Sequence, residues 1–228
     1  MTSLNGKALA RFIDHTLLKP DATSADIEKL CGEARAHSFY SVCVNGSRIE
    51  LARHHLEESE VKVAATIGFP LGASDSDVKR YETEAAVDAG AHEIDLVLNI
   101  GWLKERLDDM LLREIRDVVE AADERPVKVI IETALLEHDE KIRACNLIVE
   151  GGAQFVKTST GFAKTGATVE DVKLIRATVG AKFGVKASGG IRDTATALAM
   201  IEAGANRLGC SNSIAIIEGL KTLAIPAT

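Results

Sequence analysis

The sequence FVKTSTGF, at residues 155–162, is a short apolar run with a lysine in its middle and small, turn-forming residues directly after it. The same design returns at residues 183–192, which read FGVKASGGIR. Each run predicts a buried strand that ends in a loop. Neighbouring parallel strands lie about 5 Å apart, so we expect Lys157 and Lys186 to be neighbours in a closed interior.

The rest of the chain alternates between short apolar runs and segments with a helical hydrophobic period. We expect eight strands, at residues 12–18, 40–45, 62–70, 92–99, 126–133, 155–160, 183–188 and 206–211. We expect helices at residues 3–11, 24–38, 47–59, 75–89, 102–122, 137–150, 168–178 and 193–202, and from about 213 onward.

Three joints between a helix and the next strand share one pattern, with glycine at 90, 152 and 204 followed by alanine. Glycine supplies the positive φ that closes a helix. Strands alternating with helices form right-handed parallel units, and eight of them close into a (β/α)₈ TIM barrel, here with a short extra N-terminal helix. A doubly wound open sheet is the alternative, but no GxGxxG follows the first strand. We therefore predict a single barrel domain over residues 1–228.

Composition excludes several classes of function. The formal charge of -7 and the pI near 5.4 argue against a nucleic-acid or membrane-surface partner. The four cysteines show no CxxC spacing and the six histidines no metal-binding spacing, so we expect no metal site and no disulfide framework. We also expect no cofactor. The N-terminus does not resemble a signal peptide and no apolar run reaches a membrane-spanning length, which favours a cytoplasmic protein.

Strand alternation assigns an unusual set of polar residues to the barrel interior. They are Asp14, Thr16, Cys43, Asp95, Lys128, Glu132, Lys157, Ser159 and Lys186. An ion pair that only satisfies another buried charge would explain any one of them. Aliphatic side chains serve stability better than several such charges, so two adjacent lysines with several carboxylates point to chemistry.

Two positive charges roughly 4 Å apart repel by about 4 kcal/mol at an effective dielectric near 20, enough to lower a lysine pKa from about 10.4 to about 7. A neutral amine is what a lysine needs to attack a carbonyl and form a Schiff base. The hydroxyl-rich TSTG after Lys157 makes it the predicted nucleophile. Lys186 is then the perturbing cation, and Asp95 the proton shuttle.

The substrate is suggested by two turns of small residues, SGG at 188–190 and GCSNS at 209–213, which lead into the last two helices. Free backbone N–H groups at helix starts favour an anion. In this fold a phosphate site is often built after strands 7 and 8. We therefore expect a phosphorylated substrate.

The segments FVKTSTGF, VKASGGIR, EIDLVLN, KVIIET and IDHTLLKP together resemble the deoxyribose-phosphate aldolase family, from about Ile13 to Ser213. The resemblance implies a metal-free class I aldolase of deoxyribose phosphate catabolism. Such an enzyme reversibly cleaves 2-deoxy-D-ribose 5-phosphate into D-glyceraldehyde 3-phosphate and acetaldehyde.

The resemblance also assigns residues. The Schiff-base lysine falls on Lys157, the lysine that tunes it on Lys186, and the aspartate of the proton relay on Asp95. The expected substrate-binding positions are Asp14, Thr16 and Cys43 near the sugar, and Gly161, Gly189, Gly190 and Ser211 around the phosphate.

The sequence departs from the family in two places. Some members have a lysine directly after KTSTG, near the phosphate, whereas this chain has Phe162. Lys164, two residues further on, is a guessed replacement for that phosphate contact. The chain ends KTLAIPAT without the tyrosine that some members carry, so proton exchange is expected to rely on Asp95, Lys186 and water.

Two alternatives stay open: another Schiff-base phosphosugar aldolase of the same fold, and a non-catalytic sugar-phosphate binding barrel. Family members are commonly dimers or tetramers, so we expect a homo-oligomer.

Overall fold

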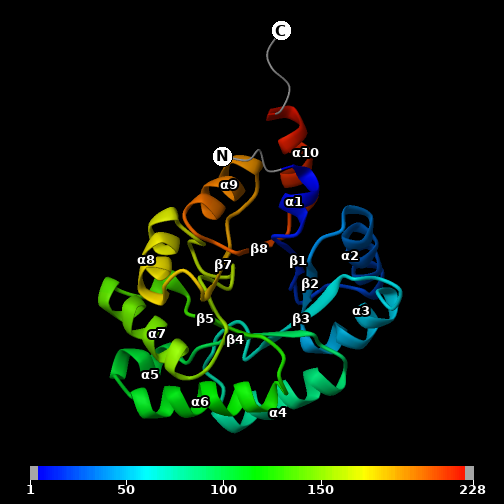
Figure 1. Cartoon of the computed structure of the whole chain (residues 1–228). Helices are drawn as coiled ribbons and strands as arrows, with labels where there is room; N and C mark the ends of the chain where they lie inside the picture. Colours follow the sequence, from blue (N-terminus) through cyan, green and yellow to red (C-terminus); the bar gives the residue numbers. More distant parts are fainter. Residues whose placement is uncertain (1–4, 224–228) are drawn as a thin grey trace.

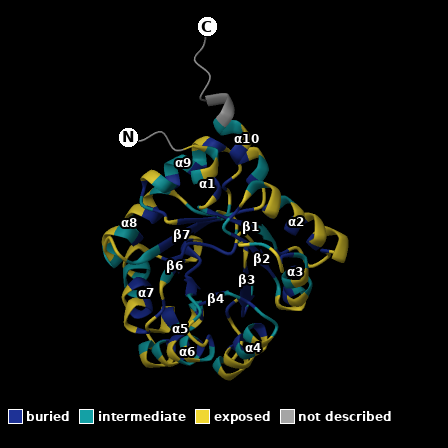
Figure 2. Cartoon of the chain, turned by 45° about the vertical axis from the view of Figure 1, so that its right-hand side comes forward, coloured by how far each residue is buried: buried dark blue, intermediate teal, exposed yellow. Residues whose placement is uncertain are grey.

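The computed structural model describes residues 5–223. Eight parallel strands follow one another in chain order and close into a barrel, with β1 paired to both β2 and β8. Figure 1 and Figure 2 show the helices as an outer ring around these strands. The strands are β1 (Ile13–Leu17), β2 (Ser41–Val44), β3 (Lys62–Ile67), β4 (Glu93–Val97), β5 (Val127–Ile130), β6 (Phe155–Lys157), β7 (Gly184–Ser188) and β8 (Arg207–Cys210). The predicted (β/α)₈ barrel is confirmed.

The helices cover the outside of the barrel and leave its two ends open to loops (Figure 2). They are α1 (Gly6–Ala10), α2 (Ser24–His37), α3 (Ile49–His55), α4 (Ser76–Asp88), α5 (Ile100–Glu105), α6 (Asp108–Ala121), α7 (His138–Glu150), α8 (Val169–Val179), α9 (Thr194–Glu202) and α10 (Ser213–Leu223). Two short 3₁₀ turns, η1 (Gly46–Arg48) and η2 (Thr133–Leu135), follow β2 and β5. None of the helices described between residues 5 and 223 is long and apolar enough to cross a membrane.

The expected N-terminal helix is present as α1, although residues 1–4 and 224–228 lie outside the described part of the chain. The assignment of all 228 residues to one domain, and the role of the end of the chain, therefore stay predictions. The helix expected at residues 102–122 is two helices, α5 and α6, because Arg106 adopts a left-handed conformation with φ 60° and ends α5.

The repeated glycine joints behave as expected. Gly90, Gly152 and Gly204 have φ values of 95°, 86° and 115°, which suit glycine far better than any other residue. Each lies between the end of one helix and the start of the next strand, so one local solution returns the chain to the barrel three times.

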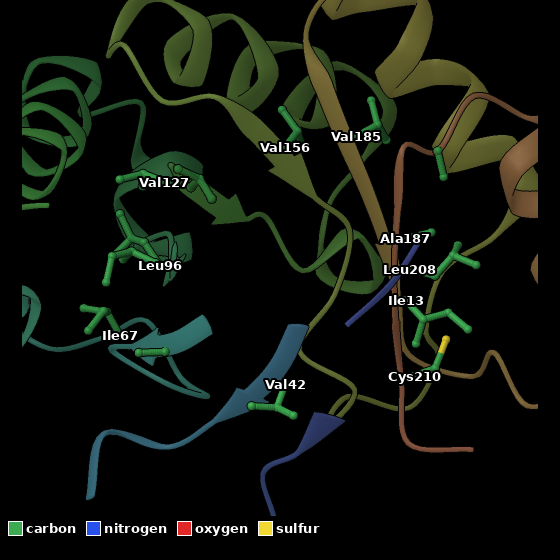
Figure 3. Packing of buried hydrophobic residues seen from close by; sticks show 14 of the residues in the cluster. Ile13, Val42, Ile67, Leu96, Val127, Val156, Val185, Ala187, Leu208 and Cys210 are labelled. Carbon is green, nitrogen blue, oxygen red and sulfur yellow. The ribbon is translucent and has the colours of Figure 1, made fainter. Parts of the chain in front are cut away.

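The two faces of the strands carry different side chains. Alternate residues such as Leu96, Val156 and Val185 face outward and join the large hydrophobic core between strands and helices (Figure 3). Their neighbours Asp95, Lys157 and Lys186 face the barrel interior and are also buried. Helix packing thus uses the outer face and leaves the inner face free for a polar site.

Candidate active site

The two lysines singled out in the sequence lie side by side. Lys157 on β6 and Lys186 on β7 are directly paired in the strand register. Lys186 is fully buried and Lys157 is only 2% exposed. The expectation that they are enclosed neighbours is confirmed.

Asp95 on β4 joins the lysines into one network. Its Oδ2 lies 2.7 Å from Lys157 Nζ and 2.7 Å from Lys186 Nζ. Its Oδ1 lies 2.7 Å from Nζ of Lys128 on β5. One buried carboxylate therefore holds three ammonium groups in fixed positions.

The network continues across the barrel floor as a cluster of ion pairs. Its members are the acids Asp14, Glu93 and Asp95 and the bases Lys128, Lys157, Lys186 and Arg207. Three carboxylates face four cations, so the cluster holds one positive charge too many when all seven groups are ionised.

The excess charge falls on Lys157. Lys128 pairs with two carboxylates, at 2.7 and 2.8 Å, and Lys186 with two, at 2.5 and 2.7 Å. Arg207 also has two, at 3.0 and 3.2 Å. Lys157 has Asp95 alone among the described residues. Loss of its proton balances the cluster and leaves every other ion pair intact.

The pKa values follow this geometry. Burial lowers the pKa of Lys157 below its ordinary value; Asp95 opposes this and the charge of Lys186 adds to it. Burial acts the same way on Lys186, but Asp14 and Asp95 outweigh it and raise the pKa of that lysine. For Asp95, burial is outweighed by the three lysines around it, which hold its pKa well below the usual range.

This differs in one respect from the sequence-based expectation. The sequence suggests repulsion by Lys186 as the cause of a low pKa of Lys157, whereas loss of hydration is the larger cause. The reason is Asp95, which lies between the two ammonium groups and offsets part of their repulsion. The predicted lowering of the pKa of Lys157 is unchanged.

A pocket of about 310 Å³ opens above Lys157 at the carboxyl ends of the strands. It is lined by Thr16, Leu17, Leu18, Lys19, Lys157, Thr160, Gly161, Phe162, Ser188, Gly189, Gly190, Ile191, Arg192, Gly209 and Ser211. The four residues predicted to contact a phosphate are all among them, as is Thr16.

The glycines allow two loops to meet at this pocket. Gly161 and Gly189 have φ values of 86° and 82°. A Cβ atom on Gly166 would lie 2.1 Å from the carbonyl oxygen of Gly189, closer than any real contact. Larger side chains here would push the two loops apart, so the small residues keep both backbones at the pocket wall.

Asp14 and Cys43 lie beneath the pocket and do not line it. Asp14 accepts hydrogen bonds from Ser41 Oγ at 2.7 Å and Arg207 Nη1 at 3.0 Å and pairs with Lys186. The Cys43 thiol lies 3.9 Å from Asp95, and burial raises its pKa. A direct part in binding substrate stays a prediction for both, since the structure gives each a partner in the cluster instead.

Sequence reasoning missed three cations. Arg207 shares the inner face of β8 with Gly209, and the alternation that placed the lysines could have placed it. Lys19 and Arg192 follow the ends of β1 and β7, where parallel barrels carry their sites, and both line the pocket. Lys164, the guessed phosphate contact, is not among the lining residues.

No group of three or more metal-ligating side chains is found between residues 5 and 223. The residues gathered at the pocket are amines, hydroxyls and backbone amides around one carboxylate. Such a set can capture a carbonyl with an amine, move protons and hold an anion.

Comparison with known proteins agrees with this chemistry. Residues 9–220 match the model of the DeoC/LacD family aldolases. The deoxyribose-phosphate aldolase of Alkaliphilus oremlandii is 56% identical over 214 residues, which are 93% of this chain and 96% of the relative. That of Thermococcus gammatolerans is 55% identical over 95% of this chain and 98% of its own length.

Solved structures show the same likeness in three dimensions. The tetrameric deoxyribose phosphate aldolase of Aeropyrum pernix superposes with a TM-score of 0.89 at 32% identity, covering 96% of this chain and 94% of that one. An aldolase named QR15 gives a TM-score of 0.90 at 39% identity, with 97% of both chains covered. By sequence, fold and site, this chain belongs to the DeoC/LacD family of aldolases.

Proposed function

We propose that this chain is a class I aldolase that reversibly cleaves 2-deoxy-D-ribose 5-phosphate to D-glyceraldehyde 3-phosphate and acetaldehyde. Its relatives from Alkaliphilus oremlandii and Thermococcus gammatolerans are named deoxyribose-phosphate aldolases, which supports this substrate. Lys157 is the nucleophile: its neutral amine adds to the aldehyde carbon of the open-chain sugar, and loss of water leaves a protonated Schiff base.

The observation that carries the proposal is the position of Lys157 in the ion cluster. It is the one cation of the seven-residue cluster with a single carboxylate partner, and it is the one that lines the pocket. A buried amine that is favoured neutral and reachable from the pocket is the requirement for Schiff-base catalysis. The other cations of the cluster each pair with two carboxylates.

Asp95 and Lys186 move the protons. The cleavage step removes the hydroxyl proton at C3 as the bond between C2 and C3 breaks, and the bond electrons pass into the Schiff base to form an enamine. A proton then returns to C2. Asp95 Oδ2 contacts both lysine ammonium groups, so a proton can pass between Lys157 and Lys186 through one shared oxygen.

The loops after β6, β7 and β8 support the proposal that the pocket binds the phosphate group of the substrate. Gly161, Gly189, Gly190 and Ser211 line the pocket, and backbone N–H groups in turns before helices favour an anion. Arg192 also lines the pocket and can supply the positive charge that some family members obtain from a lysine at the position of Phe162. Phosphate binding there directs the aldehyde end of the sugar toward Lys157.

Reductive trapping tests the proposal. The protein is incubated with acetaldehyde and sodium borohydride, and the modified peptide is mapped by mass spectrometry. Hydride addition to the Schiff base leaves an ethyl group on Lys157. A sugar-phosphate binding protein without catalysis would gain no mass, and an adduct on another lysine would reject the assignment.

Donor specificity separates this aldolase from other Schiff-base aldolases of the same fold. Acetaldehyde is compared with dihydroxyacetone and its phosphate as the donor to glyceraldehyde 3-phosphate. We expect turnover with acetaldehyde, whereas preference for either ketone would identify a different phosphosugar aldolase.

Assembly and location are also part of the proposal. A homo-oligomer, dimeric or tetrameric, is supported by the tetrameric relative from Aeropyrum pernix. Light scattering on the purified protein measures the mass against 24.3 kDa for one chain. A cytoplasmic location fits a charged sugar-phosphate substrate, and cell fractionation tests it.

A further inference from the structure

A buried histidine that the proposed mechanism does not use lies directly behind the phosphate end of the pocket. His15 is on β1, between Asp14 on the inner face and Thr16 at the pocket. Its side chain points to the outer side of the barrel, toward α2 and α10, and His15 is only 3% exposed. It is a polar group placed where the outer face otherwise carries apolar side chains (Figure 3).

Both ring nitrogens of His15 have partners. Nε2 lies 2.8 Å from Glu33 Oε2 on α2, and Nδ1 lies 2.8 Å from Ser213 Oγ, the first residue of α10. A carboxylate can only accept, so Glu33 keeps a proton on Nε2 and fixes the orientation of the ring. Nδ1 then carries no proton and accepts a hydrogen bond from the Ser213 hydroxyl.

Ser213 closes the turn that carries the phosphate-site residue Ser211. Its hydroxyl has one proton, which it donates to His15 Nδ1, so the 3.1 Å approach of its Oγ to the carbonyl oxygen of Cys210 is a close contact across the turn that contains Ser211. His15 and Cys210 are directly paired in the register of β1 and β8. Figure 3 shows Cys210 and Ile13 on this face of the barrel.

We propose that His15 is a positioning residue for phosphate recognition, acting through Ser213 on the turn between Cys210 and Ser213. The proposal rests on the proposed function, because it concerns the same phosphate site. Glu33 orients His15, and His15 Nδ1 accepts the hydroxyl proton of Ser213. This hydrogen bond ties the first residue of α10, and with it the turn whose backbone and Ser211 face the phosphate, to β1. No atom of His15 touches the substrate.

The histidine at the opposite end of the barrel provides a matched control. His92 Nδ1 accepts a hydrogen bond from the Val63 backbone N–H at 2.9 Å, and Arg53 Nη1 lies 3.1 Å from its Nε2. His92 precedes the amino end of β4, away from the pocket. It joins neighbouring elements as His15 does, but it has no connection to the phosphate loops.

The test compares His15→Ala, Ser213→Ala and His92→Ala, with 2-deoxyribose 5-phosphate and unphosphorylated 2-deoxyribose as substrates. We expect the first two variants to raise KM for the phosphorylated sugar roughly tenfold, because small displacements of a binding group cost that much or more. KM for the unphosphorylated sugar and kcat for both sugars stay at the wild-type values. His92→Ala changes KM for neither.

Inorganic phosphate supplies a readout that needs no turnover. The rise in Tm that phosphate causes in the wild-type protein should shrink in His15→Ala and Ser213→Ala and persist in His92→Ala. Ser213→Ala removes one hydroxyl only, so it keeps the test valid if His15→Ala does not fold.

Equal losses with both sugars, or an unaltered phosphate response in Ser213→Ala, would overturn the positioning role of His15. Failure of the wild-type protein to form the acetaldehyde adduct would instead reject the proposed function. The phosphate response still decides the role of His15 in that case.

Discussion

Two buried lysines in this molecule have much in common and yet differ in what they can do. Lys157 lies in the barrel interior, and Lys79 lies between α4 and α6, with its ammonium 2.9 Å from Glu114 Oε2. Both are nearly or fully buried, and burial lowers the pKa of both. Each also has one carboxylate partner in the described part of the chain.

The difference is in the remaining hydrogen bonds and in access. Lys79 Nζ also donates to the carbonyl oxygens of Gly72 at 2.7 Å and Val97 at 3.0 Å, so all three of its donors are used. Among the residues that the structure describes, Lys157 Nζ donates to Asp95 alone, and Lys157 lines the pocket. A low lysine pKa marks a nucleophile only where the amine has donors to spare and a route to substrate.

The largest expected effect comes from Lys157→Leu. Turnover should fall by at least about 10⁴-fold, because the covalent step is lost. Asp95 keeps Lys128 and Lys186 as partners, and the cluster stays balanced, so we expect the free energy of unfolding to be unchanged or higher. Steady-state kinetics and urea denaturation measure the two quantities. Residual activity within a hundredfold of wild type would contradict the assignment.

Asp95→Asn should separate the nucleophile from the proton relay. Turnover is expected to fall by roughly 10²–10⁴-fold, the usual contribution of a positioned acid or base. Borohydride trapping of acetaldehyde on Lys157 should persist, since loss of the carboxylate removes the group that raises the pKa of this lysine. Trapping that disappears together with turnover would mean that Asp95 is needed to form the Schiff base.

Sequence reasoning found the barrel and most of its interior because both depend on local patterns. Alternation along β4, β6 and β7 placed Asp95, Lys157 and Lys186 on the inner face without any knowledge of the fold's details. The glycine joints marked where helices end. These features need only a few neighbouring residues to be recognised.

Contacts between distant segments could not be predicted in the same way. His15 and Ser213 are 198 residues apart, and Lys79 meets Glu114 across two helices. Lys79 follows Asp75 and Ser76 at the start of a helix, where a lysine normally faces solvent, so no pattern there indicates burial. The left-handed Arg106 that divides α5 from α6 has no glycine or proline to announce it.

Lys186→Leu tests whether the charge of Lys186 lowers the pKa of Lys157, and the readout is the pH dependence of activity. Removing this cation takes away a charge that lowers the pKa of Lys157, and Asp95 then acts more strongly on the remaining ammonium. Both effects raise the pKa of Lys157, so a smaller fraction is neutral at pH 7 and the activity optimum moves to higher pH. The profile of kcat/KM against pH measures the shift. An unshifted profile would show that Lys186 does not tune Lys157.

The smallest effect on turnover is expected at Lys79. Lys79→Met leaves Glu114 buried without its cation, which costs about 3–5 kcal/mol in the free energy of unfolding. Lys79→Met combined with Glu114→Leu should recover most of that loss, because neither charge is then buried alone. Urea denaturation gives both free energies, and kcat per folded molecule should equal that of wild type in each variant. If kcat fell as it does in Lys157→Leu, Lys79 would also take part in catalysis. Free hydrogen-bond donors and access to the pocket would then not be what distinguishes Lys157 from Lys79.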